Sequence, residues 1–143
     1  MRGGGRDELP VGFGAADGDH VVITVRGRMH PGATDYWDGN WLISPIEIAA
    51  GSLRARIPAG LRTEELRAFR EELAGAGVAR LTSLEEWLEL TVTVGRKLDV
   101  AGVSAGHGSF RITGLDRAQL PGIIDALEEV EAAYPVLGSP QQC

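Results

Sequence analysis

The sequence contains few of the residues that build covalent or metal-bound frameworks. Its single cysteine, Cys143, is the last of 143 residues, so no disulfide can form within the chain. The histidines do not have the close spacing of a zinc site, and no cysteine accompanies them: His20, His30 and His107. The sequence therefore predicts no metal site and no cofactor, and nothing in it requires an oxidising compartment.

Long hydrophobic runs and an excess of basic charge are also absent. No apolar run approaches the roughly 18–20 residues that span a membrane, and no hydrophobic region follows Met1 to Arg6 as in a signal peptide. We therefore expect a cytoplasmic protein. The formal net charge of −6 argues against nucleic-acid binding and is compatible with a basic protein partner. Ordinary solubility is the alternative explanation of that charge.

No catalytic motif is present. The glycine-containing segment Gly102 to Gly108 lacks the Lys-Ser/Thr ending of a phosphate loop. The serines have no nucleophile-elbow context, and no pair of carboxylates is marked as an acid–base dyad. We therefore expect no catalytic residues, and a binding protein in preference to an enzyme.

Length and composition suit one domain with its own core, since 43% of the 143 residues are hydrophobic. Residues 1–19 contain six glycines and are predicted to be a flexible lead-in, with a short strand near Val11 to Phe13 as the one element within it. Residues 20–135 are predicted to form a single α+β domain, and residues 136–143 a frayed tail.

Alternating apolar residues predict strands in both halves of the chain. The expected strands are His20 to Arg28, Trp41 to Ala50 with an interruption at Pro45, Leu53 to Ile57, Glu86 to Val94, Lys97 to Val100, and Ser109 to Thr113. Apolar residues at helical spacing predict one helix from Thr63, as N-cap, to Gly75 and another from Asp116 or Leu120 to Tyr134.

Each predicted strand has one apolar and one polar face, which is typical of an antiparallel sheet packed on one side. The expected fold is a two-layer α+β domain with about six mainly antiparallel strands and two helices on one face. Three strands followed by a helix, twice, also suggest a duplicated βββα pattern. The polar face should carry Glu47, Arg54, Arg56, Glu89, Asp99 and Arg111.

The segment Asp35-Tyr36-Trp37-Asp38-Gly39-Asn40-Trp41-Leu42 concentrates scarce aromatic residues: it has two of three tryptophans and one of two tyrosines. In one interpretation the aspartates accept backbone donors in a turn, Gly39 permits positive φ, and the tryptophans close the end of the core. In the other, the aromatic residues contact a partner. We assign Asp35, Tyr36, Trp37 and Asp38 to a partner-binding site, and Gly39, Asn40 and Trp41 to a structural motif. The oxygen groups lack the regular spacing of a calcium loop.

Two further expectations accompany this motif. If Trp37 is fully buried, Trp37→Ala should reduce the free energy of unfolding by roughly 3–5 kcal/mol. The last helix carries a cluster of acidic residues, which is either a solvated face or a second surface for a basic partner: Asp125, Glu128 and Glu129.

The segment from Asp35 to Leu42 resembles the signature of the WapI-type immunity proteins. Thr63-Glu64-Glu65-Leu66 at a helix start, Glu85-Glu86-Trp87-Leu88-Glu89-Leu90 at a strand start, and the ending Tyr134-Pro135 are similar to the same family. The resemblance covers about His20 to Pro135. It departs at Leu115 to Leu120, where relatives more often have an Asp-Gln-aromatic motif.

The resemblance implies a protein that binds and neutralises a cognate toxin, a tRNA-cleaving nuclease in named members of the family. It implies no catalytic residues, and it places toxin specificity in variable surface residues. A small-ligand-binding domain that uses the polar sheet face or the aromatic loop is the alternative.

Overall fold

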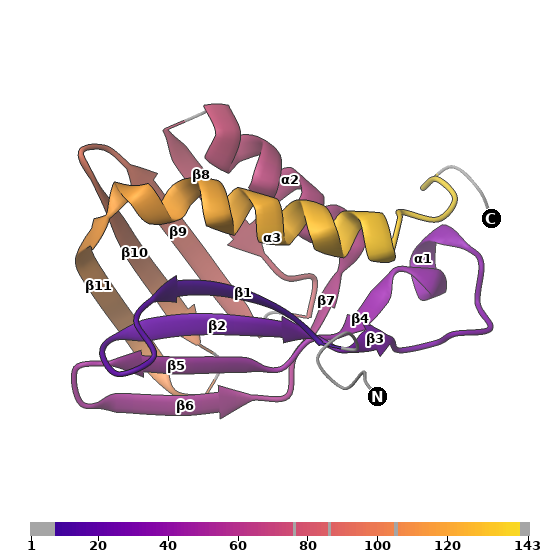
Figure 1. Cartoon of the computed structure of the whole chain (residues 1–143). Helices are drawn as coiled ribbons and strands as arrows, with labels where there is room; N and C mark the ends of the chain where they lie inside the picture. Colours follow the sequence, from indigo (N-terminus) through magenta and orange to yellow (C-terminus); the bar gives the residue numbers. More distant parts are fainter. Residues whose placement is uncertain (1–7, 76, 86, 105, 141–143) are drawn as a thin grey trace, which may run out of the picture.

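The computed structural model describes residues 8–75, 77–85, 87–104 and 106–140. Within these residues eleven strands form three antiparallel sheets, accompanied by three α-helices (Figure 1). The predicted α+β class with mainly antiparallel strands is confirmed. The expected single sheet of about six strands is instead divided into three.

The N-terminal sheet has the strand order β1-β2-β5-β6, and the C-terminal sheet has the order β11-β10-β9-β8. A small sheet with the order β3-β4-β7 lies beside α1 at one end of the molecule (Figure 1). The strands are β1 (Leu9–Gly14), β2 (His20–Val25), β3 (Gly27–Arg28), β4 (Trp41–Ile43), β5 (Ile46–Ala50), β6 (Leu53–Ile57), β7 (Gly60–Arg62), β8 (Val78–Thr82), β9 (Leu88–Val94), β10 (Lys97–Ser104) and β11 (Gly108–Asp116).

The helices are α1 (Tyr36–Gly39), α2 (Thr63–Gly75) and α3 (Leu120–Ala133). The two long helices lie side by side on the same side of the large sheets (Figure 1). Helix α2 packs beside β8, and α3 packs against β1, so each helix contacts an edge strand of the sheet from the other half of the chain. This exchange joins both halves around one hydrophobic core.

The duplicated pattern has one more strand in each half than the sequence predicted. Each half contains a four-stranded antiparallel sheet and then a long helix, and the first half has the small sheet and α1 inserted. The prediction missed β7 and β8, and it placed β3 in one continuous strand with β2. Two or three residues, as in β3 and β7, are too few to establish a periodic pattern.

Pro45 separates two strands, as its missing N–H led us to expect. The chain leaves the small sheet after β4 and joins the N-terminal sheet at β5. The carbonyl of Pro45 accepts the N–H of Thr24 at 3.0 Å, so the junction stays attached to β2. A two-residue hairpin turn joins β5 to β6, since Ala50 pairs with Leu53 and Gly51 has φ of +59°.

The predicted N-cap of the first long helix was wrong, whereas the second of the two starts predicted for the last helix, Leu120, is confirmed. The Thr63 hydroxyl is buried and has no hydrogen-bond partner among the described residues, so it does not cap α2. Glu65 Oε1 instead accepts the N–H of Arg62 at 2.9 Å. Asp116 caps only a 3-10 turn, Arg117–Gln119, and the regular helix α3 begins after it with Pro121 in the first turn.

The flexible lead-in expected at residues 1–19 is corrected for the part that the structure describes. Leu9–Gly14 forms β1, which pairs with β2 over its whole length. Val11 and Phe13 are fully buried, and the Phe13 ring lies 6.2 Å from that of Phe69 in α2. The short strand predicted near Val11 to Phe13 is therefore confirmed within β1, where Gly12 and Gly14 occupy the face opposite the core. Residues 1–7 lie outside the described residues.

We predict that Phe13→Ala reduces the free energy of unfolding by about 3–5 kcal/mol, because it removes a large buried ring shared by β1 and α2. Urea denaturation followed by circular dichroism measures the change. Val103→Ala is the matched control, since Val103 is 54% exposed and should change stability by less than about 0.5 kcal/mol. Equal effects of both substitutions would show that β1 is not part of the cooperative core.

Candidate partner-binding site around a buried arginine

The aromatic motif folds into a single helical turn, α1, and Asp35 is its N-cap. The Asp35 carboxylate accepts the N–H of Asp38 at 3.2 Å, and its carbonyl accepts the N–H of Gly39 at 2.9 Å. These bonds are the ones predicted for an aspartate that accepts backbone donors in a turn. Asp35 and Asp38 are exposed, so their charges remain available to solvent.

The aromatic rings of the motif surround the guanidinium of Arg62, from β7. Its Cζ atom lies 4.9 Å from the centre of the Tyr36 ring, 5.1 Å from that of Trp37 and 5.3 Å from that of Trp41. The Tyr36 and Trp37 rings meet edge to face, with centres 4.9 Å apart. We call these three rings and Arg62 the arginine cage. A cation near several aromatic faces is stabilised by their quadrupoles.

Hydrogen bonds and an ion pair complete the surroundings of Arg62, which is only 3% exposed. One terminal nitrogen donates to the carbonyls of Tyr36 and Trp37, and the other pairs with the carboxylate of Glu64. The guanidinium therefore ties α1 to the junction between β7 and α2. Among the described residues, three buried polar atoms at this junction have no partner: Arg62 Nε, Thr63 Oγ1 and Glu64 Oε1.

Gly39 and Asn40 hold the segment that follows α3. The Asn40 side chain donates to the Leu137 carbonyl at 3.1 Å and accepts the Leu137 N–H at 2.8 Å. A Cβ at Gly39 would lie 2.8 Å from Leu137 Cδ1 and 3.0 Å from the Ala33 carbonyl oxygen. Gly39 is therefore needed for close approach and not for positive φ, which corrects the sequence interpretation.

Arg28 reinforces this attachment. It donates to the Gly39 carbonyl at 2.7 Å and to the Pro135 carbonyl at 2.8 Å, and its Cζ lies 5.7 Å from the centre of the Tyr134 ring. The predicted frayed tail is thus wrong for the described residues 136–140, where Leu137 is bonded to the motif. Residues 141–143 lie outside the described residues.

The tryptophans are less buried than side chains that close the end of a core. Trp37 is 49% exposed, so the condition for the 3–5 kcal/mol cost of Trp37→Ala is not met. Trp41 is half-buried, with its ring beside Arg62. One face of Trp37 therefore contacts Arg62, and about half of its surface is free to contact another molecule.

The acidic residues of the last helix form a separate surface. Asp125, Glu128 and Glu129 are exposed on α3, at a spacing that places them on one helix face. Helix α1 lies beyond the C-terminal end of α3 (Figure 1). The seven residues that the sequence assigned to partner binding thus form two surfaces, on α1 and on α3.

Arg62 is a site residue that was not predicted from the sequence. Its only signal was a charged residue in the short apolar stretch Gly60-Leu61-Arg62. A buried arginine needs acceptors and aromatic faces, but apart from Glu64 the residues that supply them lie more than 20 positions earlier in the chain. Spacing along a single sequence does not reveal that kind of pairing.

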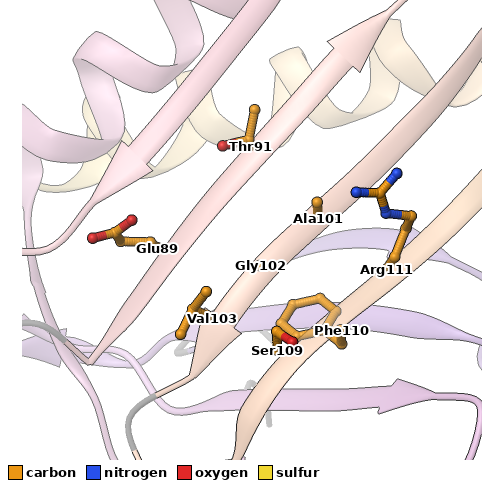
Figure 2. Close-up of a pocket in the computed structure, with 8 residues that line it drawn as sticks. All are labelled: Glu89, Thr91, Ala101, Gly102, Val103, Ser109, Phe110 and Arg111. Atoms are coloured by element: carbon orange, nitrogen blue, oxygen red, sulfur yellow. The ribbon is translucent and has the colours of Figure 1, made fainter.

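The outer face of the C-terminal sheet has an open hollow of about 500 Å³ (Figure 2). Figure 2 shows Ala101 and Gly102 on the middle strand of the group, and the charged Glu89 and Arg111 on the strands to either side. Glu89 and Arg111 are exposed, as the sequence predicted for the polar face. The hollow spans β9, β10 and β11 and contains no paired catalytic groups.

On the outer face of the N-terminal sheet, His20 pairs with Glu47. Its Nε2 lies 2.8 Å from Glu47 Oε2, and its Nδ1 lies 2.8 Å from the Gly18 carbonyl and 3.1 Å from the Ala15 carbonyl. Both ring nitrogens therefore face acceptors, which favours the doubly protonated ring. The hydrogen bond to Glu47 raises the pKa of His20 above 6.5, and the same bond lowers the pKa of Glu47.

Metal binding and membrane insertion find no support in the part of the chain that the structure describes. No group of three His, Cys, Asp or Glu side chains there could hold a metal ion. None of the helices there is long and apolar enough to cross a membrane.

Comparison with known proteins links the chain to one family. A family model described as the immunity protein WapI-like family matches residues 13–135. The matched range contains all four residues of the arginine cage and the acidic residues on α1 and α3. It ends at Pro135, two residues before Leu137, which Asn40 binds. A search of curated proteins found no match.

We predict that Arg62→Ala reduces the free energy of unfolding by about 3–5 kcal/mol, because it leaves the half-buried Glu64 without its ion-pair partner and empties the cage. Arg62→Lys should recover only part of the loss, since an ammonium cannot reproduce the planar fork. Arg67→Ala, at an exposed position of α2, is the control. If Arg62→Lys is as stable as the native chain, the fork geometry has no structural role.

The His20–Glu47 pair should make stability depend on pH. The pKa of His20 is raised on folding, so its contribution is complete below about pH 6.5 and is lost as pH rises through the folded-state pKa. Glu47 contributes above its ordinary pKa, near 4.5, and loses its contribution as pH falls through the lowered value. His20→Gln should therefore destabilise the protein more at about pH 6 than at about pH 9. A difference in melting temperature that does not change with pH would contradict this.

Proposed function

The chain belongs to the WapI-like immunity protein family, and we propose that it is a non-catalytic protein that neutralises a cognate toxin by direct binding in the cytoplasm. The observation that carries the proposal beyond family membership is the half-exposed Trp37, held rigidly between Arg62 and Tyr36 with two exposed carboxylates beside it. Rigid aromatic side chains at the centre of a contact contribute most of the affinity in many interfaces.

Charge supports a basic partner. Asp35 and Asp38 flank Trp37, and the whole chain carries a formal net charge of −6. Opposite charge on a toxin domain would accelerate association and favour the correct orientation. The acidic face of α3, with Asp125, Glu128 and Glu129, is proposed to add to this attraction without lying at the centre of the contact.

Rigidity also supports a binding role. Binding loses less conformational entropy when the contact residues are already fixed in the free protein. Here the turn is capped by Asp35, attached through the Arg62 guanidinium, and joined by Asn40 to the end of the chain. Trp37 would therefore meet a partner without first being ordered.

The second candidate is a small-ligand-binding domain, and the hollow over β9, β10 and β11 is the observation that favours it. That hollow is open and its charged residues are spread over its edges (Figure 2). Small-molecule sites usually enclose most of the ligand, so the hollow fits this function less well. Thermal-shift measurements across a metabolite panel discriminate the two candidates.

We predict that Trp37→Ala and the pair Asp35→Asn with Asp38→Asn each weaken toxin binding at least tenfold. Trp37→Ala should destabilise the fold by only about 1 kcal/mol, the scale of one exposed cation–π contact. Toxin domains encoded next to this gene would be co-purified with the native chain and the variants, and affinities measured by calorimetry. Asp35→Asn keeps a side-chain acceptor for the turn.

The matched comparison is the triple variant Asp125→Asn, Glu128→Gln and Glu129→Gln. It should slow association mainly at low salt, because exposed charges away from the centre of an interface act on the encounter. A greater loss of affinity in the triple variant than in Trp37→Ala would place the contact on α3. If no neighbouring toxin co-purifies and none is neutralised, the proposed function is wrong.

A further inference from the structure

The small sheet has one buried face and one exposed face with apolar side chains. Leu42 and Leu61 are fully buried on the inner side. On the outer side Ile43 is 43% exposed, and Met29, directly after β3, is 39% exposed. This outer face continues into the arginine cage, because Trp41 and Arg62 are paired neighbours on β4 and β7.

A hollow of about 200 Å³ opens on this outer face beside the cage. It is lined by Met29, His30, Trp41, Gly60 and Glu85. Gly60 helps to create it, because a Cβ there would lie 2.7 Å from Met29 Cε and 3.6 Å from the Trp41 ring. The lining thus combines an aromatic ring, a flexible thioether, an imidazole and a carboxylate.

The charge around the hollow is negative. Glu85 is exposed and makes no ion pair within the described residues, whereas the one buried cation nearby, Arg62, is already paired with Glu64. Asp35 and Asp38 of the adjoining turn are also exposed. A side chain that enters this hollow meets apolar walls and then a carboxylate.

We propose that this hollow receives an arginine or lysine side chain of the partner protein. The alkyl stem would lie along Met29 and Trp41, and the cationic end would reach the Glu85 carboxylate. This inference rests on the proposed function for its partner, but the recognition chemistry belongs to the hollow itself. It makes the outer face of β3, β4 and β7, together with Trp37, one continuous docking surface.

The chemistry distinguishes this occupant from an apolar one. A long basic side chain has both the apolar stem and the charged end that the walls and rim provide. Its cation gains from the Trp41 ring and from a charge-assisted hydrogen bond to Glu85. A leucine or phenylalanine would cover the exposed carboxylate without pairing it, which is unfavourable.

The test needs no toxin, so its result is independent of the proposed function. The ¹⁵N-labelled full chain is titrated at low salt with N-acetyl-arginine methylamide, N-acetyl-lysine methylamide and N-acetyl-leucine methylamide. The expected result is saturable shifts of the Trp41 indole N–H and the Gly60 amide with the two basic probes, and at least fivefold weaker binding of the leucine probe. Shifts of equal size with all three probes would overturn the proposal.

Two variants and one control test the residues. Glu85→Gln should weaken binding of the arginine probe at least threefold. Gly60→Ala should abolish this binding by filling the hollow. Gly60→Ala should still fold, because the crowded atom is the end of the flexible Met29 side chain. Glu89 is an exposed carboxylate on the C-terminal sheet, so Glu89→Gln should leave binding of the arginine probe unchanged. Unchanged binding in Glu85→Gln, or an equal loss in Glu89→Gln, would overturn the proposal.

Discussion

Burial of the Arg62 charge is the constraint on which this end of the molecule depends. A guanidinium removed from water is costly unless its charge and its N–H groups are satisfied. Glu64 supplies the opposite charge, and the backbone of α1 supplies carbonyls. The rings of Tyr36, Trp37 and Trp41 surround the rest of the guanidinium. The cluster of scarce aromatic residues in the motif is therefore explained by one cation that lies 21 residues or more beyond them.

The attachment of α1 by Arg62 also determines how the segment after α3 is held. Because α1 is held over β7 by Arg62, Gly39 and Asn40 face the segment after α3, and Asn40 forms two hydrogen bonds with Leu137. Arg28 adds bonds to both Gly39 and Pro135. A terminal segment with little apolar periodicity is thus ordered by backbone hydrogen bonds, which are directional and do not depend on the side chains of that segment.

Periodicity predicted the elements that bury a continuous apolar face, such as β2, β5, β6, α2 and α3. These elements depend on local alternation, which one sequence contains. Only the middle of β1 was predicted, as a short strand near Val11 to Phe13, because glycines occupy its outer face. Strand β7 was missed because three residues establish no period. The arginine cage could not be predicted for a different reason. Its members are brought together because the chain leaves the small sheet for β5 and β6 and returns at β7, where Arg62 pairs with Trp41. The sequence of α1 and β7 alone does not record that pairing.

Structure and recognition share Trp37 but use different parts of it. The ring face toward Arg62 belongs to the fold, and the exposed half belongs to the proposed contact. The carboxylates of Asp35, Asp38 and Glu85 are exposed, and of these only Asp35 also caps the turn. Most of the outward charges can therefore change without loss of the cage. A fold arranged in this way can keep one rigid aromatic platform while the charges around it are altered to suit different partners, since specificity is a difference of affinities set at the rim of the contact.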